Sequence, residues 1–217
     1  MFGSLDFEHY FYQGYNELEE LDQSKSISGI KIYSNYQQID PCGEKMLKVA
    51  KLASRYDLPL MFHGGESFSA YEKYGKATIS NLIMPKEIEY LAKDYGAEII
   101  ISHLCTPFVK ELVEVVKNNE RIYSDMSGLM NSIHGEQYLQ ESIDEIKYFL
   151  SECGPEKLLF GTDFPVQTHA DSVYMIEEAM KNYSIEDKQK VYYDNAKKLL
   201  KITSKKIISL QEEMEGQ

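Results

Sequence analysis

The sequence predicts an α/β protein with a parallel sheet, because short apolar runs alternate with helical patterns along the chain. Three apolar runs end in a side chain that can bind a metal or move a proton: His63 after Leu60-Met61-Phe62, His103 after Ile99 to Ser102, and Asp163 after Leu158 to Thr162. Parallel strands present their carboxyl ends at one rim, where (β/α) barrel enzymes have their active sites. We therefore expect His63, His103 and Asp163 to lie together on such a rim.

The other elements follow from apolar spacing and turn residues along the chain. A strand stub at 2–6 precedes expected strands at 27–33, 60–63, 99–103, 121–125 and 158–163. Expected helices span 7–21, 43–56, 85–95, 108–118, 138–152, 169–181 and 185–200. Pro85 suits a first helical turn, and Gly96 suits a helix end. The pattern thus gives five strands and a stub, too few to close a barrel of eight.

Long connections and the chain's carboxyl end complete the expected organisation. The segment 67–81 is long for a strand-to-helix connection, so we expect it to cover the site as a lid. The segment 126–137 is a second irregular loop, and we expect both loops to select the substrate. Residues 1–203 are predicted to form one domain, and residues 204–217 a charged tail.

Composition limits the class of protein. The chain has 217 residues and a net charge of −12, which argues against nucleic acid as a partner because phosphate binding requires clustered Lys and Arg. An apolar run of about 18 residues and an export signal are both absent from the sequence, so we expect a cytoplasmic protein that does not interact with membranes. Its 3 cysteines, Cys42, Cys105 and Cys153, form no CxxC pair and are predicted to be reduced structural thiols.

Two histidines and an aspartate at strand ends indicate metal or proton-transfer chemistry. Neutral imidazole and carboxylate are the ligands of a catalytic zinc, which keeps one position open for water. Water activated by the metal would attack, and a remaining His or Asp would carry the proton. Each residue also has a structural interpretation: a single His at a strand end is usually structural, and Asp163 could cap the following helix.

Six other polar residues have weaker assignments. Lys31 could orient an anionic substrate, or it could pair at the strand edge with Asp40 or Glu44. Tyr33 and Asp125 end strands and could line the pocket. His134 and His169 are expected at the surface, and His9 is expected to be exposed.

The ordered motifs resemble the amidohydrolase-related family, which includes aminocarboxymuconate semialdehyde decarboxylase and related decarboxylases, lactonases and hydrolases. The resemblance rests on Gly29-Ile30-Lys31-Ile32-Tyr33, Tyr36-Gln37, Asp40-Pro41, Leu58 to Gly65, Ile101-Ser102-His103, Phe160 to Pro165, Asn195-Ala196 and Leu199-Leu200. It implies a distorted (β/α)8 barrel whose divalent metal, usually zinc, is bound by a His-x-His on the first strand, a His on the fifth and an Asp on the eighth. By this resemblance His63 and Asp163 are metal ligands, Asp163 also carries the proton, and His103 is catalytic or orients the substrate. From their own positions in the chain, Lys31 and Tyr33 are expected to bind the substrate.

The sequence departs from the family at the first two metal ligands. It contains no His-x-His, and Phe2 to Leu5 would correspond to the end of the third strand. We therefore expect an incomplete barrel lacking roughly the first two to three strands and binding a divalent metal weakly.

The expected function is metal-dependent hydrolysis of a small polar or carboxylated molecule, in a chain that could form homo-oligomers. A nonoxidative decarboxylase and a metal-independent lactonase are alternatives within the family. An inactive barrel fragment that serves as an interaction module is the alternative from another class.

Overall fold

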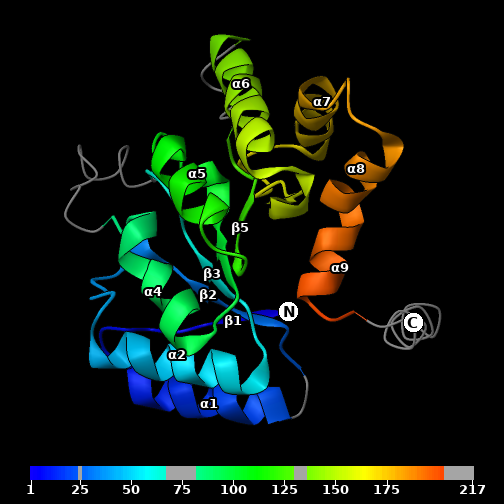
Figure 1. Cartoon of the computed structure of the whole chain (residues 1–217). Helices are drawn as coiled ribbons and strands as arrows, with labels where there is room; N and C mark the ends of the chain where they lie inside the picture. The colour runs from blue at the N-terminus through cyan, green and yellow to red at the C-terminus, as the bar shows by residue number, and fades with distance from the viewer. Residues whose placement is uncertain (24–25, 67–81, 130–135, 203–217) are drawn as a thin grey trace.

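The computed structural model describes residues 1–23, 26–66, 82–129 and 136–202. Its sheet has 6 parallel strands in the order β1-β2-β3-β4-β5-β6, so that each strand lies beside the next one in the chain (Figure 1). The strands are β1 (Phe2–Ser4), β2 (Gly29–Ile32), β3 (Leu60–Phe62), β4 (Ile99–Ile101), β5 (Ile122–Asp125) and β6 (Leu158–Leu159). The predicted α/β class and the partial barrel are confirmed.

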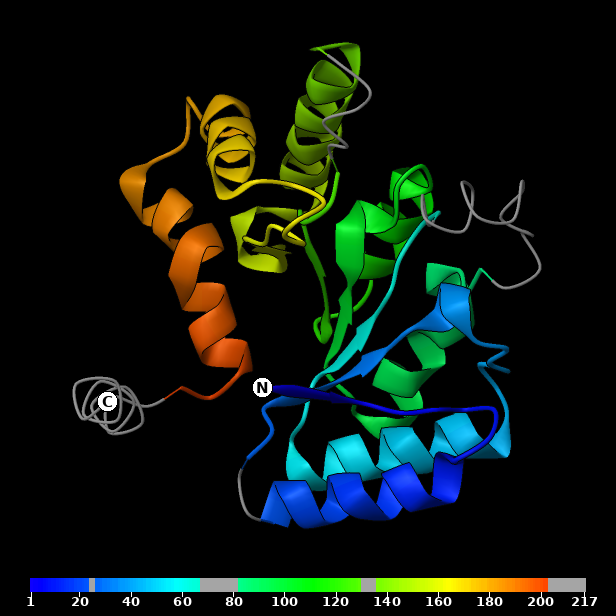
Figure 2. The ribbon, with the colours of Figure 1, turned by 180° about the vertical axis from the view of Figure 1, so that it is seen from behind.

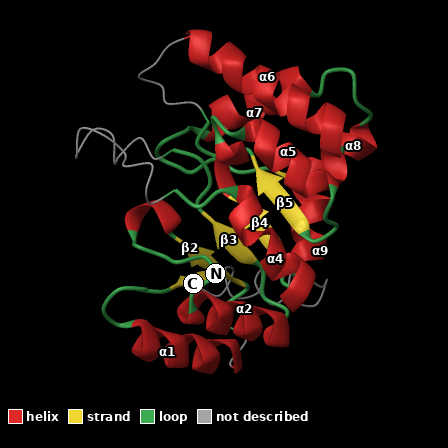
Figure 3. Cartoon of the chain, turned by 60° about the vertical axis from the view of Figure 1, so that its left-hand side comes forward, coloured by secondary structure: helices red, strands yellow, loops and turns green. Residues whose placement is uncertain are grey.

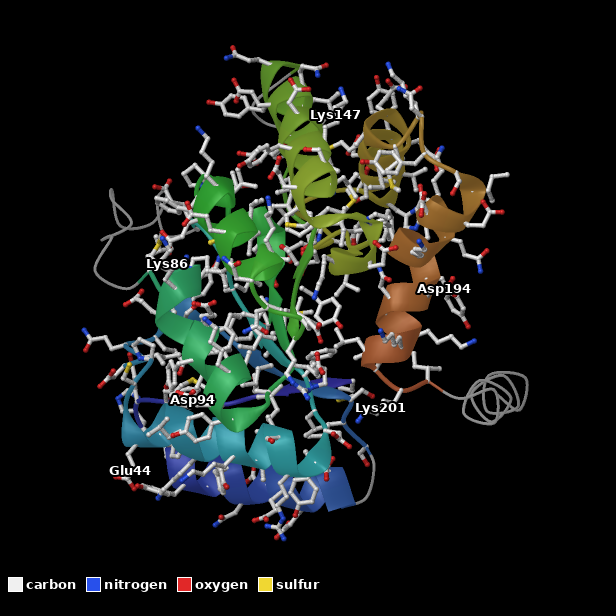
Figure 4. The ribbon with its side chains drawn as sticks, in the orientation of Figure 1. Glu44, Lys86, Asp94, Lys147, Asp194 and Lys201 are labelled. Carbon is white, nitrogen blue, oxygen red and sulfur yellow. The ribbon has the colours of Figure 1, made fainter. Side chains whose placement is uncertain are left out.

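Helices connect the strands and cover the outside of the sheet. In Figure 1, α1 and α2 lie below the sheet, while α4, α5 and α6 follow one another along its outer side. The helices are α1 (Phe11–Gln23), α2 (Glu44–Tyr56), α4 (Pro85–Tyr95), α5 (Val109–Lys117), α6 (Glu136–Cys153), α7 (His169–Ala179), α8 (Ile185–Gln189) and α9 (Asn195–Leu199). Charged side chains occupy the outer surface of this layer; Lys86 on α4 and Lys147 on α6 are labelled in Figure 4.

Strand periodicity divides the sheet into two unequal faces. Alternate residues point outward against the helices, and these form the main core: Ile30, Ile32, Leu60, Phe62, Ile99, Ile101, Ile122 and Leu158. Each of them has at most 2% of its surface exposed. The strands are short but apolar throughout, as expected for a parallel sheet that is covered by helices.

The inner face has a smaller apolar cluster and remains open at the sheet edges. Ile100 and Leu159 pack there with Leu199 of α9, and Phe2, Met61 and Tyr123 join them at its margin. The pairings within the described residues run from β1 to β6 without joining these two edges. In both Figure 1 and Figure 2 the amino end of β1 lies beside the end of α9. In Figure 3 the strands β2 to β5 lie between α1 and α2 below and α5, α6 and α7 above, and the amino end of the chain lies near α2.

Most predicted elements differ from the structure in their bounds: for example, the strands expected at 27–33 and 99–103 are Gly29–Ile32 and Ile99–Ile101. Three differences have a visible physical reason. The last strand ends at Leu159 instead of 163, because the Phe160 amide donates to Val191 O (3.0 Å) outside the sheet. The first helix begins at Phe11 instead of 7, because Asp6 Oδ1 accepts from the amides of Glu8 (2.8 Å) and His9 (3.0 Å) and forms a turn there. One turn of π-helix, Lys190–Asp194, interrupts the expected helix 185–200.

The predicted start and end of α4 agree with the structure, and three predictions fall outside the described residues. Pro85 opens α4 and Gly96 closes it in the left-handed conformation (φ 68°). Residues 67–81, His134 and the tail 204–217 lie outside the described residues, so those predictions stay predictions. The described helices include none with the length and apolarity to span a membrane.

Candidate active site

His63 and His103 are brought together by a tight passage of the chain after β3. Gly64 passes so close to the next strand end that an added Cβ would lie 2.4 Å from Ser102 O. Gly65 follows with φ 70°, and the Glu66 amide donates to Thr106 O (2.9 Å). Only glycine fits this approach, which explains why the Gly-Gly pair follows the histidine.

The backbone after β4 adopts a strained conformation in which the His103 ring faces the His63 ring. His103, Leu104 and Cys105 all have positive φ (62°, 46° and 53°), a conformation that L-residues rarely adopt. Such strain costs about 1–3 kcal/mol per residue and concentrates at functional sites. His103 Nε2 lies 3.2 Å from His63 Nδ1. The strain therefore places two imidazoles in direct contact.

When both imidazoles are neutral, the hydrogen bonds assign their tautomers. His103 Nδ1 lies 2.8 Å from the Ser127 carbonyl, which can only accept, so Nδ1 carries the hydrogen. His103 Nε2 is then an acceptor, and His63 Nδ1 donates to it. This leaves His63 Nε2 as a lone pair, and that atom is buried without a hydrogen-bond partner among the described residues. A buried lone pair of this kind is suited to a metal ion or a proton.

The surroundings of His63 disfavour its protonated form. Burial lowers its pKa to about 3, and the nearby His103 and Lys31 act in the same direction against the opposing charge of Asp125. At neutral pH His63 is therefore uncharged, which is the form that binds metals.

Asp125 and Ser127 hold His103 in place from behind. Asp125 is 6% exposed and its Oδ1 accepts from the His103 amide (3.1 Å) and from Ser127 Oγ (2.6 Å). Burial raises the pKa of Asp125, but His103, Ser127 and Lys31 together outweigh it and keep the carboxyl pKa below its usual range. Ser127 in turn presents its carbonyl to His103. The sequence indicates Asp125 as a pocket residue but gives no signal for Ser127, because a serine two residues past a strand has no distinctive spacing.

Asp163 lies across Gly128 from His103. A Cβ added to Gly128 would lie 2.9 Å from Asp163 Oδ2 and 3.0 Å from His103 Nδ1, so glycine is needed between them. Asp163 has φ 55° and is exposed. It does not cap α7, because Thr168 does so by accepting from the Asp171 amide. The structural interpretation of Asp163 as a helix cap is therefore wrong.

Lys31 points to the inner side of the sheet. Its Nζ donates to Ser102 Oγ (2.9 Å) and lies 5.7 Å from the centre of the Tyr33 ring. Burial lowers the pKa of Lys31, although Asp125 and Asp163 oppose this. The alternative pairing with Asp40 or Glu44 is not present among the described contacts: Glu44 pairs with Lys48 (2.9 Å).

Two cavities share His103 and Asp163. The outer cavity has a volume of about 360 Å³ and is lined by His63, Tyr36, Glu66, Thr106, Tyr138, Glu141, Ser142 and Glu145 besides the shared pair. The inner cavity, about 490 Å³, contains Lys31, Tyr33, Ser102 and Asp125. Both volumes are in the range of small-molecule sites. His169, at the start of α7, is exposed as predicted and lies outside both cavities, with its ring 5.5 Å from that of Phe160.

The donors present match part of a metal site. Among the described residues, no group of three or more His, Cys, Asp or Glu side chains is placed to hold a metal ion. The free lone pair of His63 and the carboxylate of Asp163 have suitable chemistry, yet a catalytic zinc takes three protein ligands. The described part of the chain therefore offers an incomplete ligand set.

Comparison with known proteins supports the fold. A family model described as Amidohydrolase matches residues 10–202. The 5-carboxyvanillate decarboxylase from Sphingomonas paucimobilis is similar in structure, with TM-score 0.66 and 17% identity over 93% of this chain and 66% of that one. So is a putative 2-pyrone-4,6-dicarboxylic acid hydrolase from Pseudomonas putida, with TM-score 0.62 and 18% identity over 86% of this chain and 67% of that one.

A third similar structure contains zinc. It is an amidohydrolase from Burkholderia multivorans, with TM-score 0.66 and 12% identity over 93% of this chain and 74% of that one. No curated protein matches the sequence. At these identities the likenesses show the fold, and the chain spans about two thirds of the length of the first two structures, 66% and 67%.

Proposed function

Because the chain belongs to the amidohydrolase family, we propose that it is a metal-dependent hydrolase acting on a small polar, carboxylated molecule. The observation that carries this proposal is that His63, His103 and Asp163 line a single cavity, with the two imidazoles in contact. The site residues and their roles below belong to the proposal.

His63 Nε2 and Asp163 are the groups that would hold a divalent metal, zinc first. Such an ion would supply the Lewis acidity that makes water a nucleophile at neutral pH. Since the described residues offer fewer than three suitably placed donors, we expect this chain alone to bind the metal weakly.

Side chains of the protein would carry out proton transfer and substrate binding. Water adds through its oxygen to the substrate carbonyl carbon, and the carboxylate of Asp163 accepts the proton and returns it to the leaving group. His103, held by Ser127 and Asp125, accepts a hydrogen bond from the attacking water at Nε2. Lys31 and Tyr33 bind the substrate from the inner cavity, where Lys31 would pair with a substrate carboxylate.

Decarboxylation is the second candidate, because the half-buried Lys31 and Asp163 line the same inner cavity, where a substrate carboxylate paired with Lys31 would lie near Asp163, the proposed proton carrier. In that reaction the carbon–carbon bond breaks, CO2 leaves, and a proton takes its place on the carbon. A metal-independent lactonase is the third candidate, and an inactive interaction module is the fourth.

Turnover by the zinc-supplemented full chain tests the proposal. Small carboxylated lactones, amides and aromatic acids are offered, acid release is followed by titration at constant pH, and CO2 is measured separately. We expect acid release that depends on zinc. Release of CO2 would identify a decarboxylase, zinc-independent lactone cleavage a lactonase, and no turnover of any substrate would favour the interaction module.

Variants separate the proposed roles. His103→Ala should lower turnover by about 100-fold or more while zinc content, measured by elemental analysis, stays the same. His63→Ala and Asp163→Asn should release zinc. The matched control is His169→Ala, which changes an exposed histidine outside both cavities. Equal zinc loss from His63→Ala, His103→Ala and Asp163→Asn would show that the division of roles is wrong.

A further inference from the structure

Lys31 is a half-buried lysine whose amino group is held by a neutral partner. Its Nζ donates to the hydroxyl of Ser102 (2.9 Å), and the ion pairs of the described residues do not include it. A lysine on the outer helices shows the contrast, since Lys117 pairs with the carboxylate of Glu152 (2.6 Å). A hydroxyl stabilises an ammonium ion less than a bonded carboxylate does, so the charge of Lys31 has little direct support.

The surroundings of Lys31 increase the fraction of its neutral amine. Burial lowers the pKa of Lys31, and the charges of Asp125 and Asp163 oppose this effect without cancelling it. The ring of Tyr33, with its centre 5.7 Å from Nζ, also favours the ammonium form. The neutral amine is the nucleophilic form of lysine, and removal from water is one of the ways in which proteins activate lysines that form imines.

Lys31 is also placed where a small molecule can reach it. Its neighbours Ile30 and Ile32 face outward into the core, so the side chain of Lys31 faces the inner side of the sheet. There it lines the inner cavity of about 490 Å³, together with the apolar side chains of Met61 and Ile100. The cavity thus offers apolar surface for the carbon body of a ligand beside a nucleophilic nitrogen.

Groups that can transfer protons line the same cavity. Formation of an imine requires proton transfer to the departing oxygen, and Asp125 and Asp163 are the carboxylates of this cavity among the described residues. Asp125 is engaged, because its Oδ1 accepts from the amides of His103 (3.1 Å) and Ser127 (3.0 Å). Asp163 is exposed and lies where the two cavities meet. Asp163 is therefore the carboxylate that can exchange protons with solvent.

We propose that Lys31 forms an imine with a small aldehyde or ketone bound in the inner cavity. The nitrogen lone pair adds to the carbonyl carbon, and the carbonyl oxygen leaves as water with one proton from the nitrogen and one from solvent, relayed by Asp163. The protonated imine carries one positive charge, which the carboxylates of Asp125 and Asp163 stabilise. This inference goes beyond the proposed function, because the step requires no metal and uses Lys31 as a nucleophile.

Reductive trapping of the imine in the full chain tests the inference. Butanone and sodium cyanoborohydride are added at neutral pH in the presence of EDTA, and reduction converts an imine into a stable secondary amine. Peptide mass spectrometry then gives the alkylation rate of each lysine. We expect Lys31 to be alkylated about tenfold or more faster than the exposed Lys110 and Lys181. A rate at Lys31 no higher than at these exposed lysines would overturn the inference.

Lys157 is a matched control within the same chain. It is half-buried, and burial lowers its pKa as it does for Lys31. Its Nζ, however, donates to the backbone carbonyls of Asn119 (3.2 Å) and Glu120 (2.6 Å), and it lies outside the inner cavity. We therefore expect Lys157 to be alkylated more slowly than Lys31. Equal rates at the two lysines would mean that a lowered pKa alone explains the reactivity, and the inference would be wrong.

Asp163→Asn separates the proton relay from the effect of charge. The carboxylate of Asp163 raises the pKa of Lys31, so its loss should speed acetylation of Lys31 by acetic anhydride, which requires only the neutral amine. Alkylation by butanone should instead slow by about tenfold or more, because the relay is lost. The control, Asp57→Asn, changes another exposed aspartate with a left-handed backbone (φ 57°) outside the inner cavity and should leave both rates unchanged. Faster reaction of Asp163→Asn with both reagents would show an activated amine without a relay and would contradict the inference.

The inference and the proposed function can fail separately, because trapping is done on metal-free protein. Fast alkylation of Lys31 in a chain that turns over no carboxylated substrate with zinc would keep the imine site and reject the hydrolase. Zinc-dependent hydrolysis by a chain whose Lys31 reacts no faster than its exposed lysines would keep the hydrolase and reject the imine site.

Discussion

The two faces of the sheet use the same strands for different purposes. On the outer face, Ile30, Leu60, Phe62 and Ile99 are at most 1% exposed and pack against the helices. On the inner face, Met61 and Tyr123 are only partly buried and Lys31 stands among them. The outer face carries the packing energy of the domain, and the inner face and rim carry its polar chemistry.

This difference follows from the two-residue period of a strand. Each strand contributes alternate side chains to both faces, so an outward-facing Ile32 and Ile30 oblige Lys31 to face inward. Stability and function can therefore be changed almost independently, residue by residue, along one strand.

The largest expected effect comes from the outer face of β3. Phe62→Ala removes a ring that is 1% exposed, and we expect the free energy of unfolding to fall by about 3–5 kcal/mol. The neighbouring change Met61→Ala, on the partly buried inner face, should cost about 1 kcal/mol because its surroundings are open. Urea denaturation measures both values. Equal losses from the two variants would break the comparison between the faces.

The next effect is the pH dependence of stability that His63 confers in metal-free protein. Its pKa is lowered from 6.5 to about 3 on folding, so the unfolded chain binds more protons between these values. The stabilising contribution is complete above pH 6.5 and is lost as the pH falls toward 3. At pH 5 the loss amounts to roughly 2 kcal/mol.

Urea denaturation in EDTA buffer at pH 7 and pH 5 measures this loss. His63→Gln should lose less stability than the wild type between the two pH values, because glutamine does not titrate. If wild type and variant lose the same amount, the proton linkage does not arise at His63.

Particular residues show how far the sequence predicts the fold and the site. The apolar runs before His63 and His103 predict the positions of β3 and β4, and Pro85 and Gly96 predict the start and end of α4, because local chemistry determines these features. The contact between the two imidazoles was beyond sequence reasoning, since it depends on three successive residues in the left-handed conformation. The end of β6 at Leu159 was also missed, because it is set by a hydrogen bond to Val191, which is distant in the chain.

The contacts of Ser127 illustrate a second limit on predicting the site from the sequence. A serine two residues past a strand has no distinctive spacing, and its function arises from a carbonyl that meets His103 and a hydroxyl that meets Asp125. Backbone carbonyls have no sequence signature, so contacts of this kind become visible only in three dimensions.

The smallest expected effect on stability comes from Lys31→Met, on the inner face. Burial lowers the pKa of Lys31, so the fold disfavours its charge, and methionine removes that penalty while losing the hydrogen bond to Ser102, which contributes about 1 kcal/mol. We expect the free energy of unfolding at pH 7 to change by less than about 1 kcal/mol. At pH values between the lowered pKa of Lys31 and 10.5, the unfolded chain binds more protons than the folded chain. Wild type should therefore gain stability relative to the variant as the pH rises through that range. Urea denaturation at pH 7 and pH 9.5 measures this gain, and a variant much less stable than wild type at pH 7 would show that Lys31 belongs to the packing of the sheet and not to its chemistry.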